Sequence, residues 1–189
     1  MFRFKHWFSL LATLSVIGLF SLGCISGGGD DNQIHWVSFD QAVKLSAQHP
    51  KKIFIDVYTP WCGWCKKMDA DTYTDPTVIS YINKNYYAVR LDAETADTFH
   101  FKDHEFVNTK PHTRGYTNEL ASSLLDGKLA YPTTVYLDEN FQRLTYVQSY
   151  ISAPDLMPIL KYFEEEKYKS MSFDDYKKSQ TGGGSATGK

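Results

Sequence analysis

Apolar residues recur at two different spacings along the middle of the chain, and the change of spacing marks a series of short helices and strands. Residues 38–48 carry apolar side chains at helical spacing behind a serine N-cap and stop before Pro50, which predicts a helix. Residues 52–58 are a continuous β-branched and aromatic run, which predicts a buried central strand. By the same criteria we expect a helix over 62–71, a helix begun by Asp75-Pro76, a strand over 86–91, a helix over 117–125, a hairpin of strands over 131–137 and 144–147, and a final helix over 152–163.

Residues 93–116 interrupt this pattern. They are rich in Thr, Asp, His and Lys and show little periodicity. A structureless loop of this length is unusual inside a compact domain. We therefore expect an insertion that either carries short strands of its own or acts as a functional loop.

The first 23 residues have the pattern of an export signal. Arg3 and Lys5 precede a mostly apolar stretch over 8–20, which is shorter than the ~20 residues that span a membrane. The stretch ends in Ser21-Leu22-Gly23-Cys24, which resembles the lipobox of bacterial lipoprotein precursors, although Ser21 stands where Leu is usual. In such precursors cleavage precedes the cysteine, which is then acylated. We predict a signal peptide over 1–23 and a lipid anchor on Cys24; the alternative is an ordinary signal peptide with a chance cysteine.

The composition at both ends indicates segments outside the folded core. Residues 24–33 are small and polar, which predicts a flexible tether between a membrane and a domain. Their acidic pair Asp30-Asp31 also resembles signals that send some lipoproteins of the Bacteroidetes group to the cell exterior. The simpler explanation is a solvated linker, and the sequence does not decide which membrane leaflet holds the anchor. Residues 179–189 are too poor in apolar side chains to pack, which predicts a disordered tail. One domain over 34–178 remains.

The charge of the chain argues against nucleic acid as a partner. Residues 1–23 hold two of the 20 Lys and Arg residues and none of the 22 Asp and Glu residues, so their removal changes the formal net charge from −2 to −4. No basic patch is visible in the pattern.

We predict an exported protein of the bacterial cell envelope that contacts a membrane through its anchor.

Two cysteines follow the predicted central strand directly. In Trp61-Cys62-Gly63-Trp64-Cys65 the spacing puts the two thiols one helical turn apart, within disulfide reach. The free N–H groups and the dipole at a helix N-terminus favour a thiolate on Cys62, which predicts that Cys62 is the nucleophile. Cys65 lies one turn inside and can resolve a mixed disulfide. The chemistry predicted is thiol–disulfide exchange, with no cofactor and no metal.

Two other interpretations of the same pair stay open. A Cys-x-x-Cys pair also forms half of a structural zinc site, but such sites usually need a second Cys or His pair. The two thiolates could serve a copper or zinc handling protein, with help from His100, His104 or His112 of the insertion. A third class is a binding module whose disulfide is merely structural.

The order strand, Trp-Cys-x-x-Cys-Lys helix, strand, helix, X-Pro strand, strand, helix resembles the thioredoxin fold over roughly residues 34–165. The Trp-Cys-Gly-Trp-Cys-Lys form, the Asp-Pro segment after it and the mid-chain insertion resemble thioredoxin-like lipoproteins of the Bacteroidetes group. The resemblance implies an α/β protein with a central mixed sheet flanked by helices and an insertion before the cis-proline strand. It implies a thiol–disulfide oxidoreductase that acts on client proteins and on an unidentified electron donor or acceptor.

The resemblance also assigns roles to single residues. Asp56, six residues before Cys62, matches a buried carboxylate whose pKa should be raised by desolvation and which can relay a proton to or from Cys65; the alternative is a solvent-facing Asp. Pro132 matches the family's cis-proline, which leaves the backbone of Tyr131 open to a substrate strand; the alternative is a trans proline on an edge strand.

Further positions differ from thioredoxin or extend the site. Trp61 is expected to pack beside the cysteine loop and shield it. Trp64 replaces a proline, which leaves the direction of electron flow open. The lysine that neighbours the buried Asp in thioredoxin has no match, because Arg90 falls two residues out of register. The predicted substrate-contacting residues are Trp61, Gly63, Trp64, Tyr131 and Pro132.

Overall fold

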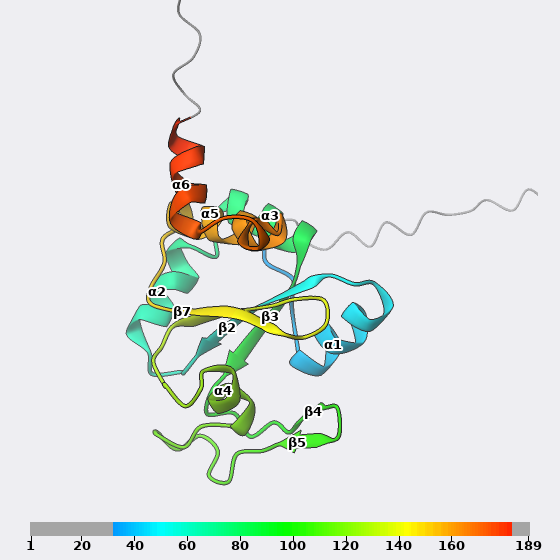
Figure 1. The fold of residues 1–189 in the computed structure, drawn as a ribbon. Helices are drawn as coiled ribbons and strands as arrows, with labels where there is room; N and C mark the ends of the chain where they lie inside the picture. Colours follow the sequence, from blue (N-terminus) through cyan, green and yellow to red (C-terminus); the bar gives the residue numbers. More distant parts are fainter. Residues whose placement is uncertain (1–31, 183–189) are drawn as a thin grey trace, which may run out of the picture.

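The computed structural model describes residues 32–182 and forms a mixed five-stranded sheet with helices on both faces (Figure 1). The strands run in the order β1-β3-β2-β6-β7. β1 and β2 pair parallel with β3, whereas β6 pairs antiparallel with both β2 and β7. The sheet strands are β1 (Trp36–Val37), β2 (Lys52–Tyr58), β3 (Tyr86–Asp92), β6 (Thr133–Leu137) and β7 (Arg143–Gln148). The predicted α/β class with a central mixed sheet is confirmed, and β2 is the central strand that its apolar run predicted.

The helices follow the predicted caps in most, but not all, cases. They are α1 (Phe39–Gln48), α2 (Gly63–Asp71), α3 (Pro76–Asn85), α4 (Glu119–Leu124), α5 (Ala153–Glu164) and α6 (Phe173–Gly182), with a 3-10 turn over Lys167–Lys169. The hydroxyl of Ser38 accepts a hydrogen bond from the Gln41 N–H, and Asp75 accepts two from the start of α3. These bonds satisfy N–H groups that have no partner within the helix.

Alternation along β2 sends its side chains into two separate cores. Ile53, Ile55 and Val57 face the core shared with α1 and α4, whereas Phe54 faces the core shared with α2, α3, α5 and α6. In Figure 1, α3 and α5 lie on one side of the sheet and α4 on the other. Phe54 is completely buried, which stabilises the fold by roughly 2–3 kcal/mol. Asp56 follows two residues later and therefore points to the same face as Phe54, toward α2.

The insertion carries short strands of its own, as one of the two predicted alternatives had it. β4 (Phe99–Phe101) and β5 (His104–Phe106) form an antiparallel hairpin outside the main sheet. Phe99 and Phe101 both pack edge-to-face on Phe39 of α1. The hairpin is thereby fixed beneath the sheet (Figure 1).

Several predicted boundaries need correction. α4 begins at Glu119 rather than residue 117, because Asn118 is its N-cap and accepts from the Leu120 N–H. β1 was not predicted, since two residues are too short to show a period. The helix capped by Ser152 is not the last one, because α6 follows it and buries Tyr176 against the α5 core.

The structure describes a few residues of each predicted terminal segment, the tether over 24–33 and the tail over 179–189. α6 continues to Gly182, so the predicted disordered tail cannot begin at residue 179. Gln33, the last residue of the predicted tether, accepts a hydrogen bond from the side chain of Asn83. The signal peptide over 1–23, Cys24 and most of the tether lie outside the described residues. Within residues 32–182 no helix is both long enough and apolar enough to cross a membrane.

Candidate active site: a disulfide at the start of helix α2

Cys62 and Cys65 form a disulfide at the N-terminus of α2, with their Cα atoms 5.3 Å apart. Cys62 is the N-cap, and its sulfur accepts a hydrogen bond from the Cys65 N–H at 3.1 Å. The helix N-terminus thus directs an N–H group and its positive dipole end at Cys62. This is the environment that stabilises a thiolate once the disulfide is reduced.

Position in the helix separates the two cysteines more clearly than exposure does. Cys62 is 5% exposed and Cys65 is 2% exposed, so both sulfurs are largely covered in the oxidised form. Only Cys62 lies at the helix end, because Cys65 is already in the first turn. A Cβ at Gly63 would meet nothing within 4 Å, so the space outside the helix end is open on that side.

Asp56 is a buried carboxylic acid on the strand that leads into the cysteine loop. It is 2% exposed, and it lies on the face of β2 that α2 covers. Burial raises the pKa of Asp56 to about 7, and the nearby charge of Arg90 partly opposes this increase. The predicted burial and raised pKa are confirmed. Near neutral pH the carboxyl group is therefore present in both protonation states.

Arg90 is a basic neighbour of Asp56, although the sequence offered no match to the lysine that thioredoxin has there. Asp56 and Arg90 are paired positions on β2 and β3, and Arg90 Nε lies 3.9 Å from Asp56 Oδ2. The other side of the guanidinium binds Asp69 of α2, and its plane covers the ring of Tyr58 at 4.5 Å. Arg90 is out of register when residues are counted along the chain, but the pairing of β2 with β3 decides which side chains meet.

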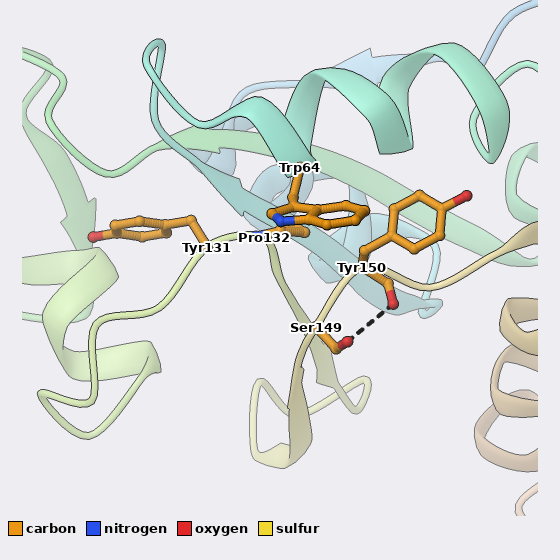
Figure 2. Close-up of a pocket in the computed structure, with 5 residues that line it drawn as sticks. All are labelled: Trp64, Tyr131, Pro132, Ser149 and Tyr150. Atoms are coloured by element: carbon orange, nitrogen blue, oxygen red, sulfur yellow. Dashed lines mark hydrogen bonds between the residues drawn. The ribbon is translucent and has the colours of Figure 1, made fainter.

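The peptide bond between Tyr131 and Pro132 is cis, as the resemblance implied. Pro132 lines a pocket of about 350 Å³ together with Trp64, Tyr131, Ser149 and Tyr150. Figure 2 shows the Trp64 ring above Pro132 with Tyr150 beside it, while the Tyr131 ring points away. The Trp64 and Tyr150 rings are 5.7 Å apart, and Trp64 is 60% exposed. Two of these residues, Ser149 and Tyr150, were not predicted; no local motif marks them, because they reach the site only through the order of β6 and β7.

Trp61 lies on the other side of the cysteine loop. Its ring packs edge-to-face on the Tyr131 ring at 6.1 Å. Its indole N–H donates to Glu94 Oε2 at 3.0 Å, and the guanidinium of Arg114 covers the ring at 4.4 Å. Trp61 therefore packs beside the loop as predicted, but it is held by two insertion residues, Glu94 and Arg114, that the sequence did not single out.

The insertion histidines do not come together. His100 lies near Asp40 and Glu105, whereas His104 lies near Glu119. In the part of the chain that the structure describes, no three His, Cys, Asp or Glu side chains are grouped in a way that could hold a metal ion.

The fold and this site define a thioredoxin-fold protein. Its cysteine pair lies at the N-terminus of α2, the helix that directly follows β2. A family model described as "Thioredox_DsbH: Protein of unknown function, DUF255" matches residues 28–172, which is most of the chain. The chain belongs to this family. A relative from Archaeoglobus fulgidus, an uncharacterized protein, is 28% identical over 85 residues, which are 45% of this chain and 67% of that protein.

Solved structures confirm the predicted thioredoxin fold. The structure titled "DsbH Oxidoreductase" has a TM-score of 0.50 and 18% identity, over 72% of this chain and 90% of that one. A candidate disulphide-isomerase from Bacteroides thetaiotaomicron has a TM-score of 0.52 and 21% identity, over 75% of this chain and 98% of that one. A thioredoxin from Thermus thermophilus has a TM-score of 0.52 and 13% identity, over 69% of this chain and 87% of that one.

Proposed function

We propose that this protein is a thiol–disulfide oxidoreductase that exchanges disulfides with client proteins through Cys62 and Cys65. The observation that carries the proposal is the Cys62–Cys65 disulfide at the N-terminus of α2, with Cys62 as the N-cap. A purely structural disulfide has no need of a helix end that favours a thiolate. The names of the similar structures, an oxidoreductase and a candidate disulphide-isomerase, agree with this activity.

The exchange proceeds in two balanced steps. In the reduced protein the Cys62 thiolate attacks one sulfur of a client disulfide, forming a Cys62–client disulfide and releasing a client thiolate. The Cys65 thiolate then attacks Cys62 Sγ, which re-forms the Cys62–Cys65 bond and releases the second client thiolate. Two electrons pass to the client, and the same steps in reverse oxidise a client dithiol.

Asp56 serves the second step by accepting the proton of Cys65. A general base is most effective when its pKa is near the working pH, and burial has raised the pKa of Asp56 to about 7. Its side chain lies under α2, on the face where Cys65 and Met68 are also buried. The Arg90 guanidinium is a positioning group that stabilises the carboxylate form of Asp56.

Clients bind across the rings that flank the disulfide. The pocket between Trp64 and Tyr150 is open to solvent and next to Pro132, so an apolar client side chain can enter it while the client sulfur reaches Cys62. Exposed tryptophan and tyrosine rings are typical anchors of protein–protein contacts. Gly63 leaves room for the client backbone over the helix end.

The domain is also proposed to be tethered to a membrane of the bacterial envelope. The support is the sequence alone: an export signal over 1–23, a lipobox-like segment ending at Cys24 and a polar linker behind it. An acylated Cys24 places the redox pair in an oxidising compartment, where two free thiols pair with each other unless a donor reduces them.

Insulin reduction in the presence of dithiothreitol tests the activity directly. The wild-type protein should accelerate precipitation of the insulin B chain, and the Cys62→Ser variant should not. A titration of the reduced protein with Zn²⁺ and Cu⁺ tests the alternative. Tight metal binding by both thiols, with no acceleration of insulin reduction at any ratio of protein to dithiothreitol, would overturn the proposal in favour of metal handling.

A further inference from the structure

The insertion is joined to the cysteine loop by a buried carboxylate. Glu94 follows β3 and is only 4% exposed. Its Oε2 accepts a hydrogen bond from the Trp61 indole N–H, and its Oε1 accepts one from the Gly115 N–H, both at 3.0 Å. Its backbone carbonyl accepts a third from the His112 N–H at 2.7 Å. Glu94 therefore holds Trp61 and the 112–115 loop together.

This connection places a cation over the side chain that immediately precedes the nucleophile. The guanidinium of Arg114 lies 4.4 Å from the centre of the Trp61 ring, and Trp61 immediately precedes Cys62. Arg114 is exposed, and no carboxylate of residues 32–182 lies within 4.0 Å of its nitrogens. Glu94, the acidic group of this connection, is buried, and both of its carboxylate oxygens accept hydrogen bonds from other groups.

A stacked guanidinium keeps its charge and its N–H edge available. The aromatic face attracts the cation and restricts its motion, while the N–H groups in its plane remain able to bind a carboxylate in a bidentate manner. The opposite wall of the site, formed by Trp64 and Tyr150, is aromatic. The two walls therefore differ: the cation over Tyr150, Lys67, is paired with Asp71, whereas Arg114 has no ion-pair partner among the described residues.

We propose that Arg114 is a specificity-determining residue that selects client segments carrying an acidic side chain next to the reacting cysteine, with Glu94 as the positioning residue that holds Arg114 and Trp61 in place. The inference rests on the proposed disulfide exchange and adds the class of client. The side chain of Arg114 binds the client carboxylate while Cys62 attacks the neighbouring disulfide.

Two peptide substrates test this selectivity. Each is a disulfide-linked dimer of a peptide with one cysteine, flanked by Asp in one peptide and by Asn in the other. The bimolecular rate constant with the pre-reduced wild-type protein should be about two- to fivefold higher for the Asp peptide, the size expected for one exposed ion pair. The preference should shrink as salt rises, because the Debye length falls from about 30 Å at 0.01 M to about 3 Å at 1 M.

Variants identify the residue that causes the preference. Arg114→Ala should make the two peptides react equally, and Arg114→Lys should retain part of the preference. Lys110→Ala is the matched control, because Lys110 lies 4.5 Å over the ring of Tyr116 in the same loop and does not contact Trp61. Its preference should equal that of wild type. Glu94→Gln should reduce the preference, since an amide cannot accept from both Trp61 and Gly115.

Two results would overturn the inference while leaving the proposed function intact. One is equal reaction of both peptides with wild type; the other is an Asp preference that survives in Arg114→Ala. If the wild-type protein reduces neither peptide, the proposed function itself fails. The Asn peptide separates the two cases, because its reduction reports disulfide exchange without any acidic group for Arg114 to bind.

Discussion

Asp56 of β2 and Arg90 of β3 are paired across the central parallel strands, with Asp56 Oδ2 3.9 Å from Arg90 Nε. The carboxyl group is buried, and the guanidinium is about one-third exposed. Arg90 then reaches Asp69 on α2, the helix that carries the cysteine pair. A buried acid, a basic group and the redox helix are thereby connected through two strands. The predictions about proton transfer depend on this connection.

The first prediction concerns stability and pH. The pKa of Asp56 is raised from 3.8 to about 7 in the folded state, so the folded protein keeps a proton that the unfolded chain releases. The contribution of Asp56 to the free energy of unfolding is complete below pH 3.8, falls as the pH rises and is lost above about pH 7. The total loss is on the order of 4 kcal/mol. Urea unfolding of the oxidised wild type and Asp56→Asn between about pH 4.5 and 8 should show the variant gaining stability relative to wild type as pH rises; parallel curves would show that the pKa of Asp56 is not raised.

The second prediction separates the relay from the nucleophile. Asp56→Asn should slow the resolving step, measured as release of a client thiol from the Cys62 mixed disulfide, by about a hundredfold at neutral pH. Alkylation of Cys62 by iodoacetamide should stay nearly unchanged, because the helix N-terminus remains intact. Asp103→Asn, at an exposed position between β4 and β5 and outside the site, is the control and should resemble wild type. The relay would be excluded if the Asp56→Asn variant reduced insulin as fast as the wild-type protein from about pH 6 to 9, the range around the reference thiol pKa of ~8.5.

The third prediction concerns Arg90. Its positive charge lowers the pKa of Asp56 against the effect of burial, so Arg90→Met should raise that pKa further. The pH at which the resolving step becomes half-maximal should move upward, while Arg90→Lys should move it less because the charge remains. The measurement is the pH profile of single-turnover resolution, with circular dichroism as a check on folding. An unchanged or lower midpoint in Arg90→Met would show that Arg90 does not act on Asp56.

Local sequence patterns predicted much of the fold because the main elements are encoded by adjacent residues. The apolar run over 52–58, the Asp75-Pro76 helix start and the placement of Cys62 at a helix end all depend on near neighbours in the chain. The thioredoxin resemblance supplied what spacing alone does not, namely the cis bond before Pro132. The class of fold and the position of the cysteine pair followed from these features.

Contacts between distant segments were the part that could not be predicted. Arg90 meets Asp56 only because β3 pairs with β2 in a particular register. Tyr150 reaches Trp64 only because β7 lies beside β6 at the sheet edge, and Glu94 reaches Trp61 through the path of the insertion. None of these positions belongs to a local motif, so their roles require the folded arrangement.

The fourth prediction concerns the lipid anchor, which lies outside the described residues. Two or more acyl chains on Cys24 would hold the protein stably on a membrane, whereas a single chain would not. Cys24→Ser should therefore release the protein from the membrane fraction or leave its signal peptide uncleaved. Fractionation with mass spectrometry of the N-terminal peptide is the measurement. A soluble wild-type protein with Cys24 removed or unmodified would contradict the anchor and leave the redox proposal untouched.

The fifth prediction tests disulfide exchange through Cys62 most directly. The Cys65→Ser variant lacks the thiol that resolves the intermediate, so it should accumulate a mixed disulfide with a disulfide-linked peptide. Cys62→Ser is the matched control, and its remaining thiol lies inside the first turn of α2. Intact mass and peptide mapping identify the cysteine that carries the adduct.

We expect a stable adduct on Cys62 in Cys65→Ser and little or none on Cys65 in Cys62→Ser. Equal or greater trapping through Cys65 would reverse the assignment of the nucleophile. The absence of an adduct in both variants, with each remaining thiol confirmed as reduced, would contradict disulfide exchange by this cysteine pair.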